Sequence, residues 1–267
     1  MQSHKAVALL DSGVGGLTVV KEIRRQLPNE NIVYFGDTAR MPYGPRSPEE
    51  VRGYVFEIID FLETQEIKAI IVACNSATSA GLHFYRAKVD IPLLGVIEPG
   101  VRAAIKHTKK CKIGVIGTTG TINSGAYQKA VQRLAPGVEL FSVPCPLFVL
   151  IVENGLVDTP EAFAVAREYL KPMKKAGIDT LILGCTHYPL MAHVIQKVMG
   201  DQVELISSAE ETARETKQIL EEKCLLNQTD PGPARHRYFV SGQATPFSVM
   251  AAKFLGEGIS AYQVILS

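Results

Sequence analysis

The feature that most constrains the fold of this chain is a segment that occurs twice. Residues 68–80 read KAIIVACNSATSA, and residues 179–190 read DTLILGCTHYPL. In each, an apolar run typical of a buried strand leads to a cysteine, Cys74 or Cys185, and then to a polar residue. The two cysteines are 111 positions apart, which is close to the length of one domain. The repeat therefore predicts two similar halves with one such cysteine each.

A second repeated segment supports two halves of the same design. Residues 6–16 (AVALLDSGVGG) and residues 111–120 (CKIGVIGTTG) each read as a strand that runs into a glycine-rich turn. Strand and helix signals alternate along the whole chain, which favours parallel sheets covered by helices. We therefore expect an α/β fold of two similar domains, each a mainly parallel sheet flanked by helices. The domains are expected to be related by internal pseudo-symmetry, with the active site between them.

The same alternation predicts where the domains divide. We expect the second domain to cover residues 99–207, with the crossing between the halves near residues 98–100. Residues 1–98 and 208–267 are expected to form the first domain, which is therefore discontinuous. Residues 226–235, which contain Asn, Asp, Gly and two prolines, are typical of a surface loop.

Composition argues against several classes of partner. The formal net charge of +1 among 267 residues indicates no nucleic acid or other polyanion as a partner. No run of 18 apolar residues is present, so we expect no membrane span, and the N-terminus is not typical of a signal peptide. The five cysteines form no C-x-x-C pair and no metal-ligand spacing. We therefore expect no metal site and a cytoplasmic chain with reduced thiols, in which Cys111, Cys145 and Cys224 are structural.

The two strand-end cysteines carry the candidate chemistry. Open α/β sheets bind ligands at the carboxyl ends of their strands, and a helix that starts after Cys74 would favour its thiolate. Two thiols on opposite walls can remove a proton from one face of a carbon and deliver a proton to the other face. This arrangement suits a racemase that uses two bases and no cofactor. A cysteine taken alone is, however, often a small core residue.

Three further residues are candidate proton partners of the thiols. Asp11 is predicted to lie at a strand end, and His187 follows Cys185 by two positions. His187 can equally be a satisfied polar residue at a helix start, and Glu153 can be an exposed carboxylate at a helix end. The glycines after Asp11 resemble a phosphate-binding loop, but their spacing does not fit G-x-G-x-x-G and favours a tight turn into a helix.

Four motifs, in this order, resemble those of bacterial glutamate racemases of the aspartate/glutamate racemase family. They are DSGVGGLTV (residues 11–19), GDTARMPYG (36–44), ACNSATS (73–79) and GCTHYPL (184–190), and they span most of the chain. The resemblance implies interconversion of L- and D-glutamate by proton transfer at Cα without a cofactor, which supplies D-glutamate for peptidoglycan. Family members are often dimers, so a homodimer is compatible with it.

The resemblance also implies roles for individual residues. Cys74 and Cys185 become the paired acid and base, and Asp11, His187 and Glu153 assist them. The residues implied to hold the substrate are Asp11, Ser12, Pro42, Tyr43, Gly44, Asn75, Ser76, Thr186 and His187. Ser76 is a modest departure, because Thr is common there, but it keeps the hydroxyl. Arg40 is the one Arg or Lys in the four motifs, so we expect backbone N–H groups and short polar side chains to hold the carboxylates.

Three alternatives stay open at this stage. An aspartate racemase would share the two-cysteine design, although DSGVGGLTV and PYG resemble the glutamate enzymes more. A cysteine-dependent hydrolase or transferase needs one nucleophilic thiol and an oxyanion hole, which leaves the second cysteine without a role. A non-catalytic amino-acid-binding protein can close two lobes around its ligand but needs neither thiol.

Overall fold

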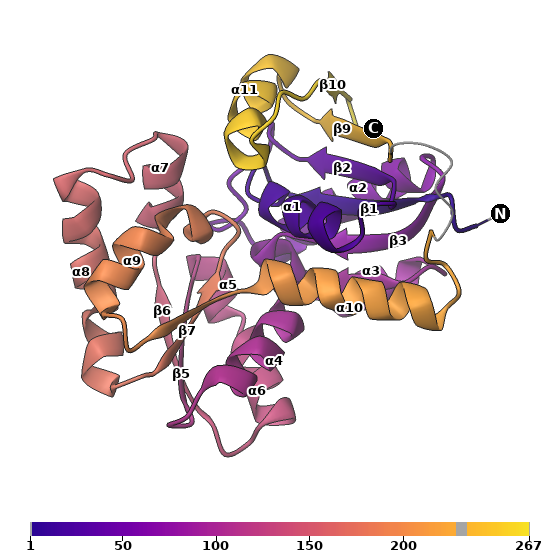
Figure 1. Ribbon diagram of the computed structural model, residues 1–267. Coiled ribbons are helices and arrows are strands. Elements are labelled where there is room, and N and C mark those ends of the chain that lie inside the picture. Colours follow the sequence, from indigo (N-terminus) through magenta and orange to yellow (C-terminus); the bar gives the residue numbers. More distant parts are fainter. Residues whose placement is uncertain (1, 228–233, 267) are drawn as a thin grey trace.

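The chain folds around two parallel β-sheets, each flanked by helices (Figure 1). The structure is a computed structural model and describes residues 2–227 and 234–266. In the larger sheet every strand pair is parallel. Across this sheet the strands run in the order β10 (Ala261–Gln263), β9 (His236–Val240), β2 (Ile32–Gly36), β1 (Ala6–Asp11), β3 (Ile67–Val72) and β4 (Leu93–Gly95).

The smaller sheet repeats the core of the larger one. Its four parallel strands run in the order β6 (Glu139–Pro144), β5 (Lys112–Gly117), β7 (Thr180–Gly184) and β8 (Glu204–Ser207). This order matches β2-β1-β3-β4, so β5 is the counterpart of β1, and β7 is the counterpart of β3. The predicted fold class, two α/β halves of the same design, is confirmed.

The strands of the first half read as continuous apolar runs because helices cover both faces of their sheet. In β1, Val7 and Leu9 pack toward one face, and Ala8 and Leu10 pack toward the other. The helices on the first face are α1 (Leu17–Gln26), α10 (Ser208–Glu222) and α11 (Ala244–Leu255). Those on the second face are α2 (Pro48–Glu63) and α3 (Asn75–Lys88).

The second half is built in the same way. One face of its sheet packs on α4 (Ile97–His107) and α6 (Ala126–Leu134). The other face packs on α7 (Leu147–Glu153), α8 (Pro160–Ala176) and α9 (Ala192–Met199). Two short elements follow its central strands: α5 (Thr119–Asn123) after β5, and the 3-10 helix η1 (Tyr188–Met191) after β7.

The chain crosses between the sheets between β4 and α4, and again between β8 and α10. Residues 98–100, the expected crossing, instead lie in the first turn of α4, where Pro99 is tolerated because its missing N–H would have no helical partner. After α10, strands β9 and β10 join the first sheet. The domain boundaries after residues 98 and 207 stay a prediction. The loop predicted at 226–235 falls largely on residues 228–233, outside the described residues.

Within residues 2–227 and 234–266, no helix combines the length and the apolar character that crossing a bilayer requires. The same residues contain no group of three or more His, Cys, Asp or Glu side chains placed to hold a metal ion.

Candidate active site

Each candidate thiol follows a buried central strand. Strand β3 ends at Val72, and Cys74 is the N-cap residue of α3. Strand β7 ends at Gly184, directly before Cys185. Both thiols are almost fully buried, with 5% and 8% of their surfaces exposed. The repeat therefore places the two sulfurs at equivalent strand ends, one in each half.

One cavity between the halves is lined by both thiols. The other residues that line it are Ser12, Met41, Pro42, Tyr43, Gly44, Asn75, Ser76, Thr118, Val149, Glu153, Thr186 and His187. Every residue predicted for the site is among them except Asp11, which is fully buried and does not line the cavity. The structure thus brings together residues from all four sequence motifs and from α7.

Cys74 is surrounded by groups that keep it protonated. Burial and the negative charge of Asp11 raise the pKa of its thiol to about 12, against the weaker opposing effect of its hydrogen bonds. The Ala77 N–H donates to the sulfur at 3.5 Å, and the thiol contacts the Ser12 hydroxyl oxygen at 3.7 Å. The helix start does support the sulfur, as expected, but burial outweighs it, so the expectation of a favoured Cys74 thiolate is wrong.

Cys185 is surrounded differently, because an imidazole lies beside it. The sulfur and Nδ1 of His187 are 3.8 Å apart, and Nε2 of His187 lies 3.1 Å from a carboxylate oxygen of Glu153. Burial alone would lower the pKa of His187, but its hydrogen bonds to Cys185 and Glu153 raise it to about 10. A protonated imidazole favours a thiolate beside it. Glu153 ends α7, but it is not merely an exposed carboxylate, because its side chain is only partly exposed and contacts His187.

Asp11 lies close enough to Cys74 for its charge to act on the thiol, and it also makes a hydrogen bond to the second half. Its side chain is completely buried and accepts hydrogen bonds from the Gly13 N–H at 3.0 Å and from the Thr186 hydroxyl at 3.4 Å. Burial raises its pKa, and the charge of His187 opposes that rise. The glycine-rich turn makes this approach possible, because a Cβ at Gly15 would lie only 2.2 Å from Oγ1 of Thr186.

Polar contacts close the two halves around the cavity. Oγ of Ser76 lies 3.0 Å from Oγ1 of Thr118, and Nδ2 of Asn75 donates to the Tyr127 hydroxyl at 2.8 Å. The Gly120 N–H donates to the Gly44 carbonyl at 3.1 Å. These contacts connect the start of α3 and the loop before α2 to α5 and α6.

Comparison with known proteins agrees with this geometry. The family model described as Asp/Glu/Hydantoin racemase matches residues 14–216. The chain belongs to this family. A glutamate racemase from Oceanobacillus iheyensis is 50% identical to this racemase over 254 residues, which are 95% of this chain and 92% of that protein.

Solved structures extend the likeness to the fold. The crystal structure of a glutamate racemase isoform from Bacillus anthracis has a TM-score of 0.95 and 50% identity, and covers 99% of this chain and 98% of its own. A glutamate racemase from Francisella tularensis, solved with D-glutamate, has a TM-score of 0.93 and 36% identity, and covers 99% of both chains. The resemblance predicted from the four motifs is confirmed.

Sequence reasoning missed three residues that line the cavity of this racemase, namely Met41, Thr118 and Val149. A signal for Thr118 was present, because it follows β5 directly as Ser12 follows β1. Met41 was inside a motif but carried no chemistry that singled it out. Val149 is a buried apolar residue of α7, and no local pattern distinguishes such a residue from the core.

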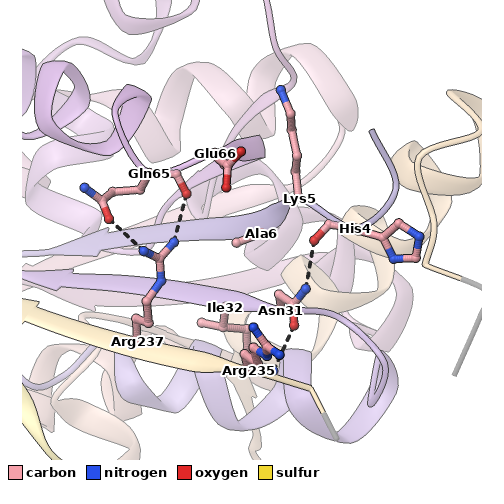
Figure 2. A pocket seen from close by; sticks show the side chains of 9 residues that line it. All are labelled: His4, Lys5, Ala6, Asn31, Ile32, Gln65, Glu66, Arg235 and Arg237. Atoms are coloured by element: carbon pink, nitrogen blue, oxygen red, sulfur yellow. Dashed lines mark hydrogen bonds between the residues drawn. The ribbon is translucent and has the colours of Figure 1, made fainter. Parts of the chain in front are cut away.

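This racemase has a larger cavity at the opposite end of the first sheet (Figure 2). It measures about 470 Å3 and lies at the amino ends of β1, β2 and β9. Its Arg237 guanidinium is held by Gln65, which accepts one hydrogen bond at its side-chain oxygen and one at its carbonyl. Parallel sheets bind ligands at the carboxyl ends of their strands, and this cavity contains neither thiol. The cavity between the thiols is therefore the candidate active site.

Proposed function

We propose that this racemase interconverts L- and D-glutamate without a cofactor, and that Cys74 and Cys185 exchange the roles of acid and base. The observation that carries the proposal is one cavity with a thiol on each wall, each at the end of an equivalent central strand. Glutamate racemases that are 50% identical over nearly the whole chain support glutamate, rather than aspartate, as the substrate.

The starting protonation state follows from the surroundings of the two sulfurs. The raised pKa of Cys74 keeps it a thiol at neutral pH. The raised pKa of His187 keeps its imidazole protonated, so a positive charge, the kind of neighbour that activates a cysteine, lies beside the Cys185 sulfur. One base and one acid are therefore ready on opposite walls, as two-base racemisation requires.

Proton transfer then inverts Cα in two steps. The Cys185 thiolate takes the Cα proton from the face of the substrate that it meets, and the electron pair stays on Cα. Cys74 gives its proton to the opposite face, which forms the other enantiomer and leaves Cys74 as a thiolate and Cys185 as a thiol. The reverse direction begins from that state. Asp11 assists at Cys74, and His187 with Glu153 assists at Cys185.

Short polar groups are proposed to hold the carboxylates of the substrate. Within residues 2–227 and 234–266, no Arg or Lys lines the cavity. Arg40 is engaged elsewhere, because it pairs with Asp37 and Glu57 and its guanidinium lies 4.2 Å from the Tyr54 ring centroid. Hydroxyl donors and backbone N–H groups remain, and the hydroxyls come from Ser12, Ser76, Thr118 and Thr186.

The two halves are proposed to separate when substrate enters. In the closed conformation the cavity has a volume of about 20 Å3, which is room for about one water molecule and not for an amino acid. The contacts that would open beside the cavity include polar ones, such as those of Ser76 with Thr118 and of Gly120 with Gly44. Such contacts can exchange with water at a modest net cost of about 0.5–1.5 kcal/mol each.

The wider role follows from the family. As a glutamate racemase, the chain would supply D-glutamate for peptidoglycan in the cytoplasm. The homodimer compatible with the resemblance stays a prediction, as does the cytoplasmic location.

A polarimetric assay on L-glutamate and L-aspartate, with no added cofactor, tests the proposal. We expect the optical rotation of L-glutamate to decay to zero, and that of L-aspartate to decay much more slowly. Addition of EDTA should leave the rate of decay with L-glutamate unchanged. Faster decay with L-aspartate would favour the aspartate racemase. No decay with either substrate, together with hydrolysis of amides or esters, would favour a cysteine hydrolase. Glutamate binding without any turnover would favour a binding protein.

A further inference from the structure

Tyr127 contacts a neighbour in sequence of each thiol, although it does not itself line the cavity. It belongs to α6, is 2% exposed and packs in a core cluster with Val115 and Ile182. Its hydroxyl oxygen accepts the hydrogen bond of 2.8 Å from Nδ2 of Asn75. Its ring closes against Gly184, where a Cβ would lie 3.2 Å from both Oη and Cε2 of the tyrosine.

These two contacts are next to the two thiols. Asn75 follows Cys74, and Gly184 precedes Cys185. A single rigid side chain, anchored in the core of the second half, thus touches the start of α3 beside Cys74 and the end of β7 beside Cys185. We propose that Tyr127 is a positioning residue, which fixes the Asn75 amide and, when the halves are closed, the spacing between the start of α3 and the end of β7. The inference rests on the function proposed above.

The hydrogen bond decides which atom of Asn75 is left for the substrate. Nδ2 is used by Tyr127, whereas Oδ1 is buried and has no hydrogen-bond partner within the described residues. An amide oxygen only accepts hydrogen bonds, so it fits the ammonium group of an amino acid rather than a carboxylate. Burial raises the pKa of Tyr127, so the phenol stays neutral and keeps this arrangement across the working pH range.

Removal of the hydroxyl tests this role, and the chain offers a matched control. Tyr127→Phe should raise KM for glutamate about 2- to 10-fold, the usual worth of one hydrogen bond, with less than about a twofold change in kcat. Tyr85→Phe is the control, because Tyr85 lies in α3, is fully buried and has a hydroxyl without a hydrogen-bond partner among the described residues. It should leave KM and kcat within about twofold of the parent. Thermal melts of both variants report whether they fold.

A double-mutant cycle separates positioning from a general effect on folding. Asn75→Ala should raise KM by itself, and Tyr127→Phe should add less than about twofold in that background, because the bond is already lost. The calorimetric Kd for racemic glutamate should follow the same pattern. An unchanged KM in Tyr127→Phe, a fall in kcat alone, or a full effect in the Asn75→Ala background would overturn the proposal. A parent that binds glutamate without racemising it would refute the proposed function but leave the comparison of Kd values intact.

Discussion

Cys74 and Cys185 occupy equivalent positions in the repeat but differ in what surrounds the sulfur. Cys74 faces the Ser12 hydroxyl, and burial raises its pKa to about 12. Cys185 faces His187, whose pKa is raised to about 10 and whose ring is held by Glu153. The repeated backbone thus determines where the thiols lie, whereas side chains that are not repeated determine the charges and hydrogen bonds around each sulfur.

This difference cannot appear as unequal catalytic efficiency in the two directions. L- and D-glutamate have equal free energies in solution, so the equilibrium constant of racemisation is one. The ratio kcat/KM must therefore be the same for both enantiomers, in the parent and in every variant. The difference has to appear elsewhere, such as in exchange with solvent or in the pH dependence.

The largest effect is expected from removal of either thiol. Because each direction needs both residues, Cys74→Ala and Cys185→Ala should each lower kcat/KM in both directions by at least about 10²- to 10⁴-fold. Cys145→Ala is the control, since Cys145 is equally buried but does not line the cavity. It should keep activity within a few-fold of the parent. If either strand-end variant racemises glutamate within about tenfold of the parent, the two-thiol mechanism is wrong.

The variants that keep one thiol should also show how the different surroundings of Cys74 and Cys185 affect proton exchange. In D2O, Cys74→Ala should wash out the Cα hydrogen of one enantiomer without inverting it, because Cys185 and His187 remain. Cys185→Ala should exchange the Cα hydrogen of the other enantiomer at a rate lower by about tenfold or more. The remaining thiol is Cys74, and each unit by which its pKa is raised lowers its thiolate fraction tenfold. Proton NMR of the Cα signal measures both rates. Equal rates would show that the surroundings of the sulfurs do not matter.

The pH dependence should report the cation beside Cys185. His187 is protonated below about pH 10, so the activity that needs its charge is complete at neutral pH and is lost as the pH rises through about 10. Above that point kcat/KM should fall about tenfold per pH unit. His187→Asn should have a lower kcat/KM at every pH. In this variant the alkaline limb, which is the fall in kcat/KM at high pH, should move toward the pKa of Cys74, about 12. A limb that stays near pH 10 in the variant would assign it to another group.

A smaller effect is expected from Glu153, which reaches Cys185 only through His187. Glu153→Gln keeps an acceptor but removes the charge, so kcat/KM at neutral pH should fall about 2- to 10-fold and the alkaline limb should shift to lower pH. The control is Asp158→Asn, because Asp158 pairs with His193 at 2.8 Å in the same half, on the surface. It should change nothing. Equal effects of the two substitutions on kcat/KM would show that Glu153 has no role in the active site.

Local patterns were enough to predict both cysteine positions. Two apolar runs, each long enough to form one strand, lead to Cys74 and Cys185. Because these runs are repeated, the sequence indicated that the two strand ends meet. The fold class followed for the same reason, because strand and helix signals alternate along the chain and depend on neighbouring residues. Strands that are buried on both faces of a sheet have little freedom in how they pack.

What the sequence could not predict depends on contacts between the halves. Tyr127 lies 52 positions from Asn75, and no local pattern connects them. Asp11 hydrogen-bonds to Thr186, a contact between the halves that no local pattern predicts, because the glycine turn brings the second half close. The protonation of Cys74 was misjudged. The helix start is visible in the sequence, whereas the burial that outweighs it appears only after folding.

The most direct test of the central claim follows the hydrogen at Cα during the first turnovers of the parent enzyme. In D2O with L-glutamate, the D-glutamate formed early should carry deuterium at Cα, because Cys74 delivers a solvent-derived proton to the face opposite Cys185. The remaining L-glutamate should stay largely protonated at Cα over the same period. Product that keeps the substrate hydrogen, or L-glutamate that gains deuterium as fast as product forms, would contradict the claim that two thiols act on opposite faces.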